Sequence, residues 1–352
     1  MLRGTLIACA AVLAACAGDA PPAAADAARA PADVAAERPV FINPTPDAAA
    51  PDAVDDVAAP PEDASPEDVA PPEDVAAPPE DVAAPDASVA CTDRTGARGD
   101  TTFRIQSGGR ERSFVVHVPP GYDRARPTPV VLDLHGWLAD GAGQAATSHL
   151  RAEADLRGLI AVHPDGVGRS WNAGACCAPA SSGVDDVQFV RDLLDRVERD
   201  WCVDRRRVHA MGFSNGGGLS HRLACELSDR IASVGPVSGT VAVPTCTPRR
   251  AVPVLHTHGT LDVVVPFNGG SIGGFEAVPA TITRWAMING CTDAPAESYR
   301  RGDVRCTTQR RCRDGAEVTL CTVTNGGHAW PDNGDLRATA NILDFFARHP
   351  MP

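Results

Sequence analysis

The chain has 352 residues, of which 43% are apolar, and a net charge of −13 from 45 acidic and 32 basic residues, all arginine. Residues 17–90 hold 17 of the acidic residues and only two arginines, whereas the chain from Cys91 onward is nearly neutral. A nucleic-acid-binding protein needs a basic stripe or a recognition module, and neither is present, so we expect no nucleic-acid partner. No apolar run of 18 residues follows the N-terminus, which excludes an internal membrane span.

The first 16 residues have the features of an export signal. Arg3 precedes a short apolar stretch, and Leu13-Ala14-Ala15-Cys16 is similar to the lipobox of bacterial lipoproteins. We therefore predict a lipoprotein-type signal peptide over residues 1–16, with Cys16 as the lipidated residue and the lipid anchor as the membrane contact. The alternative is an ordinary secretory signal. Either reading predicts an exported protein, held at the outer membrane or cell surface or secreted.

Residues 17–90 are dominated by Ala, Pro, Asp and Glu, and the segment PPEDVAA occurs twice in succession, over 71–77 and 78–84. Paired prolines prevent a continuous helix. Low hydrophobicity with one sign of charge is typical of chains that stay unfolded and extended. The sequence therefore predicts a disordered tether over residues 17–90 and a folded domain over residues 91–352.

Ten cysteines fall within residues 91–352, and an even number in an exported chain favours disulfides. No C-x-x-C pair occurs and the spacings fit no zinc site, so we expect no metal ion. We expect Cys225 to pair with Cys246. The last four should pair among themselves: Cys291, Cys306, Cys312 and Cys321. The adjacent Cys176 and Cys177 are expected to anchor their loop to Cys202 or another cysteine, with a redox pair as the alternative.

Strand and helix signals alternate along residues 91–352, which predicts an α/β domain whose mostly parallel sheet carries helices on both faces. The expected strands are residues 102–105, 113–118, 130–134, 159–163, 207–211, 231–237, 252–256 and 317–323, the first two antiparallel. The expected helices are residues 185–201, 216–227, 281–288 and 336–348.

A candidate nucleophile lies between an expected strand and an expected helix. Gly212-Phe213-Ser214-Asn215-Gly216 matches G-x-S-x-G, in which small residues allow a sharp turn that exposes a serine hydroxyl at the edge of the sheet. This pattern predicts Ser214 as the nucleophile. A glycine-rich turn with a solvated serine is the alternative.

A serine nucleophile needs a general base, which in this architecture follows it in the chain. The histidines after Ser214 are His221, His256, His258, His328 and His349. His221 belongs to the helix after the turn and is expected to face away, His256 ends a strand, and His349 lies in the terminal tail. His328 stands in a glycine-containing loop after the last strand, from which an imidazole can reach the sheet edge. We predict His328 as the base.

The base needs an acid that fixes its tautomer. Asp262 follows the strand over 252–256 and so leaves the same edge of the sheet. Asp293 lies beyond a helix, and Asp332 follows His328 and is therefore out of order. We predict Asp262 as the acid.

An oxyanion hole completes such a site. One donor is expected to be the backbone N–H of Asn215, directly after the nucleophile. The other is expected from the turn after the strand over 130–134, where His135-Gly136 precede Trp137, whose backbone N–H is our candidate. An ordinary strand-ending turn is the alternative.

Taken together, these segments resemble the bacterial esterase family of polyhydroxybutyrate depolymerases, feruloyl esterases and acetylxylan esterases, which have the α/β-hydrolase fold. The resemblance covers residues 100–348 and rests on segments that include Trp171-Asn172 before Cys176-Cys177, the Ser214 turn, His258-Gly259-Thr260-Leu261-Asp262 and Gly327-His328-Ala329-Trp330-Pro331. It implies a Ser214–Asp262–His328 triad that hydrolyses esters without metal or cofactor. Two tryptophans are expected to bind substrate: Trp171, which the loop with the adjacent cysteines places near the site, and Trp330, two residues after His328, with core packing as the alternative for Trp330.

Two features depart from that family. Trp137-Leu138 follow the His-Gly turn, where the family often has a short loop with Gly or Cys, and the acidic tail carries no recognisable binding module. The sequence thus predicts a monomeric, exported serine esterase acting on polymeric or oligomeric esters, such as feruloyl or acetyl groups on plant polysaccharide or polyhydroxyalkanoates. The alternatives are a non-catalytic surface-binding lipoprotein on the same fold and a serine peptidase.

Overall fold

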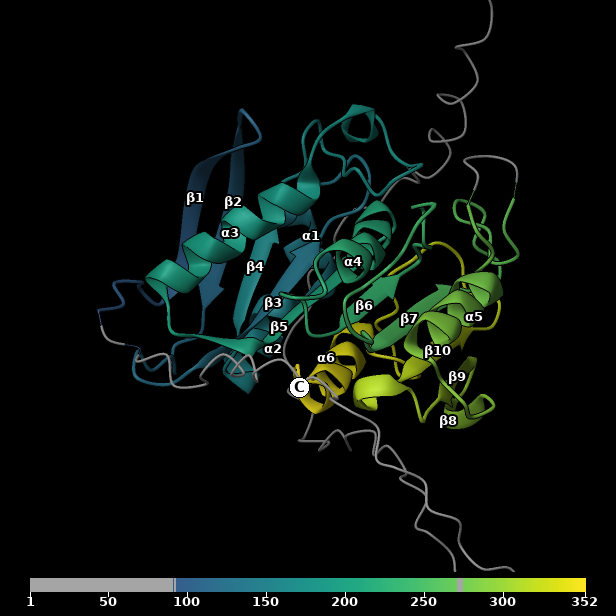
Figure 1. The fold of residues 1–352 in the computed structure, drawn as a ribbon. Coiled ribbons are helices and arrows are strands. Elements are labelled where there is room, and N and C mark those ends of the chain that lie inside the picture. The colour runs from purple at the N-terminus through teal and green to yellow at the C-terminus, as the bar shows by residue number, and fades with distance from the viewer. Residues whose placement is uncertain (1–90, 92, 271–274) are drawn as a thin grey trace, which may run out of the picture. The chain divides into compact units, whose positions relative to one another are not determined.

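A ten-stranded sheet lies at the centre of the described part of the chain, and its strand order is that of a doubly covered α/β protein (Figure 1). The structure is a computed structural model, and it describes residues 91, 93–270 and 275–352. The predicted signal with Cys16 and the predicted tether over 17–90 lie outside these residues. Within them, no helix has the length and apolar character to cross a membrane.

The strands in spatial order are β1 (Gly99–Ser107), β2 (Arg110–Val118), β4 (Ile160–Pro164), β3 (Thr128–Leu134), β5 (Val203–Phe213), β6 (Val234–Val237), β7 (Val254–Gly259), β10 (Val318–Val323), β9 (Val304–Gln309) and β8 (Ala296–Arg301). From β4 to β10 all neighbours run parallel. At one edge β1 and β2 pair antiparallel, and at the other β8 and β9 do. The predicted fold class and the antiparallel opening strands are therefore confirmed.

Helices cover both faces of the sheet. They are α1 (Gly141–Ser148), α2 (Leu150–Arg157), α3 (Asp186–Asp200), α4 (Asn215–Glu226), α5 (Val278–Asn289) and α6 (Ala338–Arg348). Helices α3, α4 and α5 share one apolar core, and α2 and α6 share the other. Alternate residues of a strand face opposite cores, so Val130 and Leu132 join the first and Val131 the second. Parallel strands that are buried on both faces have continuous apolar runs in their sequences, as β3 does over residues 130–132.

The sequence analysis did not predict four elements, namely α1, α2, β8 and β9. Helices α1 and α2 are short and α1 is rich in Gly, Ala and Ser; the side chain of Asp140 caps it by accepting the Gly143 N–H at 2.8 Å. Strands β8 and β9 form a hairpin at the sheet edge and are rich in charged and polar residues. Their pattern therefore lacks the apolar alternation that marks a strand.

The disulfides confirm part of the expected pairing. Cys225 bonds to Cys246, and the last four cysteines pair among themselves as Cys291–Cys312 and Cys306–Cys321. The expectation for the adjacent pair is wrong: Cys176 and Cys177 bond to each other, and Cys202 bonds to Cys91. The reason is spatial. Cys202 follows α3, and the same end of that helix contacts the segment before β1, since the Gly96 N–H donates to the Asp200 carbonyl at 2.8 Å.

Candidate active site

Ser214 occupies a sharp turn between β5 and α4. Its backbone angles are φ 56° and ψ −116°, a conformation that non-glycine residues rarely adopt, and its N–H donates to the Val237 carbonyl at 2.8 Å. A Cβ at Gly216 would lie 2.1 Å from the Leu134 carbonyl oxygen, and one at Gly212 would lie 2.6 Å from the Gly216 backbone. Only glycine fits at both positions, which gives the G-x-S-x-G pattern its physical reason.

The three residues predicted as nucleophile, base and acid form one hydrogen-bonded series. His328 Nε2 lies 2.9 Å from Ser214 Oγ, and His328 Nδ1 lies 2.7 Å from Asp262 Oδ2. Because a carboxylate only accepts, the Nδ1–H of His328 donates to Asp262, and Nε2 is left to accept from the serine hydroxyl. Asp262 follows β7 and His328 follows β10, a parallel neighbour of β7, so both reach the carboxyl-end edge of the sheet.

The alternative acids and bases lie elsewhere. Asp293 pairs with Arg311, and Asp332 lies 3.9 Å from His149. His349 donates from Nδ1 to the Phe345 carbonyl at 2.8 Å, inside the last helix turn. None of these three residues shares a hydrogen bond with Ser214 within the described part of the chain.

The carboxyl of Asp262 has no exposed surface and four nearby donors. Its Oδ1 accepts the N–H groups of Val264 and Val265 at 2.9 and 2.8 Å, and its Oδ2 also lies 3.2 Å from His258 Nε2. Burial raises the pKa of Asp262, but hydrogen bonds from His258 and His328 outweigh this and hold the pKa below its ordinary value. The carboxylate is therefore ionised beside His328.

The sequence analysis missed the contact of His258 with Asp262, because it considered His258 only as a candidate base. Its Nε2 lies 3.2 Å from Asp262 Oδ2, the oxygen that His328 also contacts, and it has no exposed surface. The signal was available in the sequence: His256 and His258 are two residues apart on one strand and so point to the same face.

The expected oxyanion turn lies beside the nucleophile. A Cβ at Gly136 would lie 3.5 Å from Ser214 Cβ. Buried His135 fixes this turn by donating from Nδ1 to the Gly136 carbonyl at 2.7 Å and accepting the Gly166 N–H at 2.9 Å; burial lowers its pKa and keeps it neutral. No acceptor within the described residues takes the Trp137 backbone N–H. Asn215 begins α4, where backbone N–H groups have no partner inside the helix.

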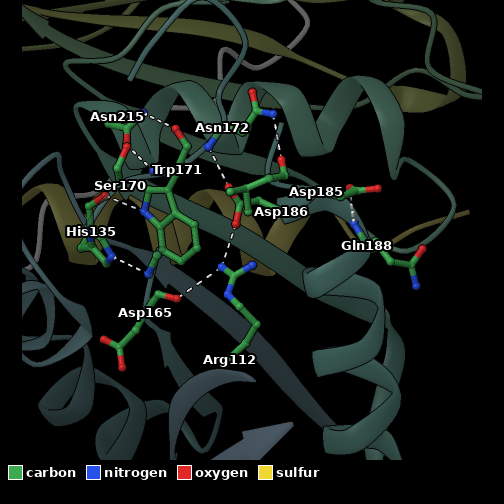
Figure 2. Close-up of polar contacts among 12 residues, drawn as sticks. Arg112, His135, Asp165, Ser170, Trp171, Asn172, Asp185, Asp186, Gln188 and Asn215 are labelled. Atoms are coloured by element: carbon green, nitrogen blue, oxygen red, sulfur yellow. Dashed lines mark hydrogen bonds and ion pairs between the residues drawn. The ribbon is translucent and has the colours of Figure 1, made fainter. Parts of the chain in front are cut away.

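The side chain of Asn215 holds the loop over residues 171–177, which we call the Trp171 loop (Figure 2). Its Oδ1 accepts the Trp171 N–H at 2.7 Å, and its Nδ2 donates to the Trp171 carbonyl at 3.0 Å. A buried ion pair supports the same loop: Arg112 Nη2 lies 2.7 Å from Asp186 Oδ1, and Asp186 Oδ2 accepts the Asn172 N–H at 2.7 Å. Asp186 therefore links the β2 side of the sheet to the edge of the site.

The expectation that Trp171 binds substrate is wrong. Its indole is fully buried in the core and donates from Nε1 to the His135 carbonyl at 2.8 Å, so it supports the His135–Gly136 turn. Trp330 is half-buried, packs edge-on against Phe213 and donates to Thr339 Oγ1 at 3.1 Å. These contacts are those of a packing residue. Trp137 instead exposes 41% of its surface while its Nε1 donates to the Ala178 carbonyl at 2.8 Å.

The chain is similar in sequence to known esterases. A family of phospholipases and carboxylesterases matches residues 185–273. Feruloyl esterase B of Piromyces equi is 34% identical over 238 residues, which cover 63% of this chain but only 43% of that protein. A Nocardia uniformis subsp. tsuyamanensis protein named "Putative esterase NocK" is 31% identical over 288 residues, covering 75% of this chain and 83% of that protein.

A solved structure shows the same fold. The acetyl xylan esterase from Aspergillus awamori matches with a TM-score of 0.53 at 14% sequence identity, over 70% of this chain and 99% of that one. The predicted identity as a carboxylic ester hydrolase of the α/β-hydrolase fold is thus supported both by sequence relatives and by fold.

Proposed function

The chain belongs to the α/β-hydrolase esterase family that includes feruloyl and acetylxylan esterases, and from this premise we propose that Ser214, His328 and Asp262 are its catalytic triad. The observation that carries the proposal is the continuous hydrogen-bonded series from the Ser214 hydroxyl through the His328 imidazole to the buried Asp262 carboxylate.

The geometry supports an acyl-enzyme mechanism. Ser214 Oγ attacks the ester carbonyl carbon while His328 Nε2 takes the hydroxyl proton, and Asp262 stabilises the imidazolium that forms. The backbone N–H groups of Asn215 and Trp137 are the proposed donors to the tetrahedral oxyanion. His328 then gives its proton to the leaving alcohol, and water activated by the same imidazole releases the acid.

For the substrate we propose a feruloyl or acetyl ester carried by a plant polysaccharide. The support is the set of relatives named feruloyl esterases and an apolar rim around the site. Exposed apolar side chains adjoin the oxyanion turn and Asp262: Trp137, Leu138, Leu261, Val263 and Val264. The exposed indole of Trp137 follows the turn that lies beside the nucleophile and suits an aromatic acyl group, because planar rings pack face to face or edge to face.

We also propose export and attachment. The five disulfides favour an oxidising compartment, which agrees with an export signal over residues 1–16. A lipid on Cys16 and an acidic tether over residues 17–90 then hold the esterase domain, residues 91–352, away from a surface. Mass spectrometry of the N-terminal peptide tests this: an unmodified Cys16, or a chain that begins elsewhere, contradicts the anchor.

Substitution of the nucleophile is the direct test. Ser214→Ala is expected to lower kcat/KM for p-nitrophenyl acetate and methyl ferulate by about 10⁴-fold or more. Ser298→Ala, at the sheet edge, serves as the control and is expected to keep the wild-type rate. Equal rates for wild type and Ser214→Ala would falsify the triad, and no turnover by the wild type of any ester would favour a binding role.

Trp137→Ala tests the substrate proposal. The substitution keeps the backbone N–H but removes the exposed ring, so kcat/KM for methyl ferulate is expected to fall about 5- to 10-fold, the effect of one lost aromatic contact. The rate with p-nitrophenyl acetate, whose acyl group is a methyl, is expected to change less than about twofold. An equal fall on both substrates would mean that the ring shapes the oxyanion turn and does not bind the acyl group.

A further inference from the structure

Three histidines lie in a line behind Asp262, and we call them the histidine chain: His221 on α4, and His256 and His258 on β7. All three have no exposed surface. His221 Nε2 lies 3.2 Å from His256 Nδ1, His256 Nε2 lies 3.0 Å from His258 Nδ1, and His258 Nε2 lies 3.2 Å from Asp262 Oδ2. At the other end, Trp285 Nε1 on α5 lies 2.9 Å from His221 Nδ1. Figure 1 shows α4, β7 and α5 as neighbours.

The two ends of this series fix the direction of every hydrogen bond. An indole N–H can only donate, so Nδ1 of His221 must accept from Trp285. A carbonyl can only accept, so Nε2 of His258, at 2.8 Å from the Val265 carbonyl, must carry a proton. Three neutral imidazoles, each protonated on Nε2, satisfy all the contacts between these ends. Any other arrangement places two N–H groups, or two bare nitrogens, against each other.

Burial keeps His221 and His256 of the histidine chain neutral. Burial lowers the pKa of His221 to about 3, although the Gly239 carbonyl raises it, and the charge of Arg284 lowers it further. Burial, with His258 and His221 as neighbours, also holds the pKa of His256 well below its ordinary value. His221 and His256 therefore add hydrogen bonds and no net charge to the neighbourhood of Asp262.

We infer that the histidine chain, with Trp285 as its terminal donor, is a set of positioning residues that presents a neutral N–H to the Asp262 carboxylate. This inference rests on the proposed triad. The N–H of His258, shared between the Val265 carbonyl and Asp262 Oδ2, steadies the oxygen that accepts from His328. Because the donor is neutral, the carboxylate keeps its full charge for the imidazolium. His258 can donate only while its Nδ1 accepts from His256, so the orientation depends on residues that touch neither substrate nor Ser214.

The tautomers of the three histidines test the histidine chain in the unaltered protein. Nitrogen-15 NMR of histidine-labelled protein distinguishes bare from protonated ring nitrogens. We expect His221, His256 and His258 each to be neutral with the proton on Nε2 at neutral pH. A proton on Nδ1 of His258, or a charged imidazole among the three, would overturn the inference without any reference to activity.

A matched pair of variants tests the effect on the reaction. His256→Gln keeps one acceptor and one donor, whereas His256→Leu has a similar size and neither. We expect His256→Leu to lower kcat about 10-fold, as for a lost hydrogen bond to a charged group, with little change in KM. The acid limb of the kcat/KM profile, which follows protonation of the base, should move up by about half a pH unit, since a carboxylate with one donor fewer attracts the imidazolium of His328 more strongly. His256→Gln should restore most of both.

A separate control covers the general cost of removing a buried histidine. His209 is also buried and bonds to Ser233 Oγ at 2.8 Å, outside the histidine chain, so His209→Leu should leave the position of the acid limb unchanged. Identical kcat and acid limbs for His256→Leu and His256→Gln would overturn the role of the chain. If Ser214→Ala kept full activity, the proposed triad itself would fail, and the tautomer measurement would still decide the order of the hydrogen bonds.

Discussion

The two sides of Ser214 are supported by different chemistry. On the oxyanion side, an ion pair between Arg112 and Asp186, both almost fully buried, holds the Trp171 loop. On the acid side, neutral imidazoles hold Asp262. A polar group at the sheet edge can thus be fixed either by full charges or by ordered neutral dipoles. The ion pair is destabilised most by the loss of one partner, whereas the neutral imidazoles are destabilised most by the gain of a proton.

The charged side carries a large burial cost that its contacts offset. Burial lowers the pKa of Arg112 and raises that of Asp186, while each group's attraction for the other opposes the shift. The Arg112 guanidinium also lies 3.8 Å from the centre of the Phe189 ring, a cation–π contact. The pair is therefore stable only while both members are present.

The largest expected effect comes from breaking that pair. Arg112→Met leaves Asp186 buried without its cation, and we expect a loss of about 3–5 kcal/mol in the free energy of unfolding, measured by urea denaturation. The control is Arg104→Met, which removes an exposed ion pair with Glu111 and should cost less than about 1 kcal/mol. Equal losses for the two variants would mean that the buried pair is not the support described here.

The two sides of Ser214 also differ in their disulfides. Cys306–Cys321, beside β7 on the acid side, closes a loop of 15 residues, and its removal by double alanine substitution should cost about 3 kcal/mol by the chain-entropy estimate. Cys176–Cys177 on the oxyanion side joins adjacent residues and restricts the unfolded chain little. Its double alanine variant should keep most of the stability and change kcat/KM instead. A larger loss of melting temperature for the adjacent pair would reverse this assignment.

The smallest effect appears on acidification. In the folded state the pKa of His221 is about 3, below its unfolded value of 6.5, so the unfolded chain binds the extra proton between those values. Stability from this residue is therefore complete above pH 6.5 and declines as the pH falls, by about 1.4 kcal/mol per pH unit. His221→Gln should flatten the dependence by that amount in urea unfolding between pH 6 and pH 4. An unchanged slope would mean that His221 is protonated in the folded protein.

Much of this architecture was predictable from local patterns. The G-x-S-x-G segment and the apolar strands are features of single segments, and the chain order of Ser214, Asp262 and His328 can be followed along the sequence, so both are predicted without knowledge of packing. The edge hairpin β8–β9 and helices α1 and α2 were missed because their sequences lack apolar periodicity.

What could not be predicted depends on contacts between distant segments. His221 was expected to face away from the site because it lies within the helix after the Ser214 turn, yet that direction leads to His256 and Trp285. Trp171 was placed at the substrate because it precedes an adjacent cysteine pair, but its large apolar ring is more stable in the core. The Cys91–Cys202 bond spans 111 residues, which no local spacing reveals.

The hairpins at the two edges of the sheet have a consequence for crowding. An open sheet can add strands from a neighbouring molecule, and exposed edges with charged side chains discourage such pairing. Strand β8 carries Glu297, Arg300 and Arg301, and β1 carries Asp100 and Arg104. Copies of the domain at high local concentration would therefore resist fibre formation, although the sheet is long and open at both edges.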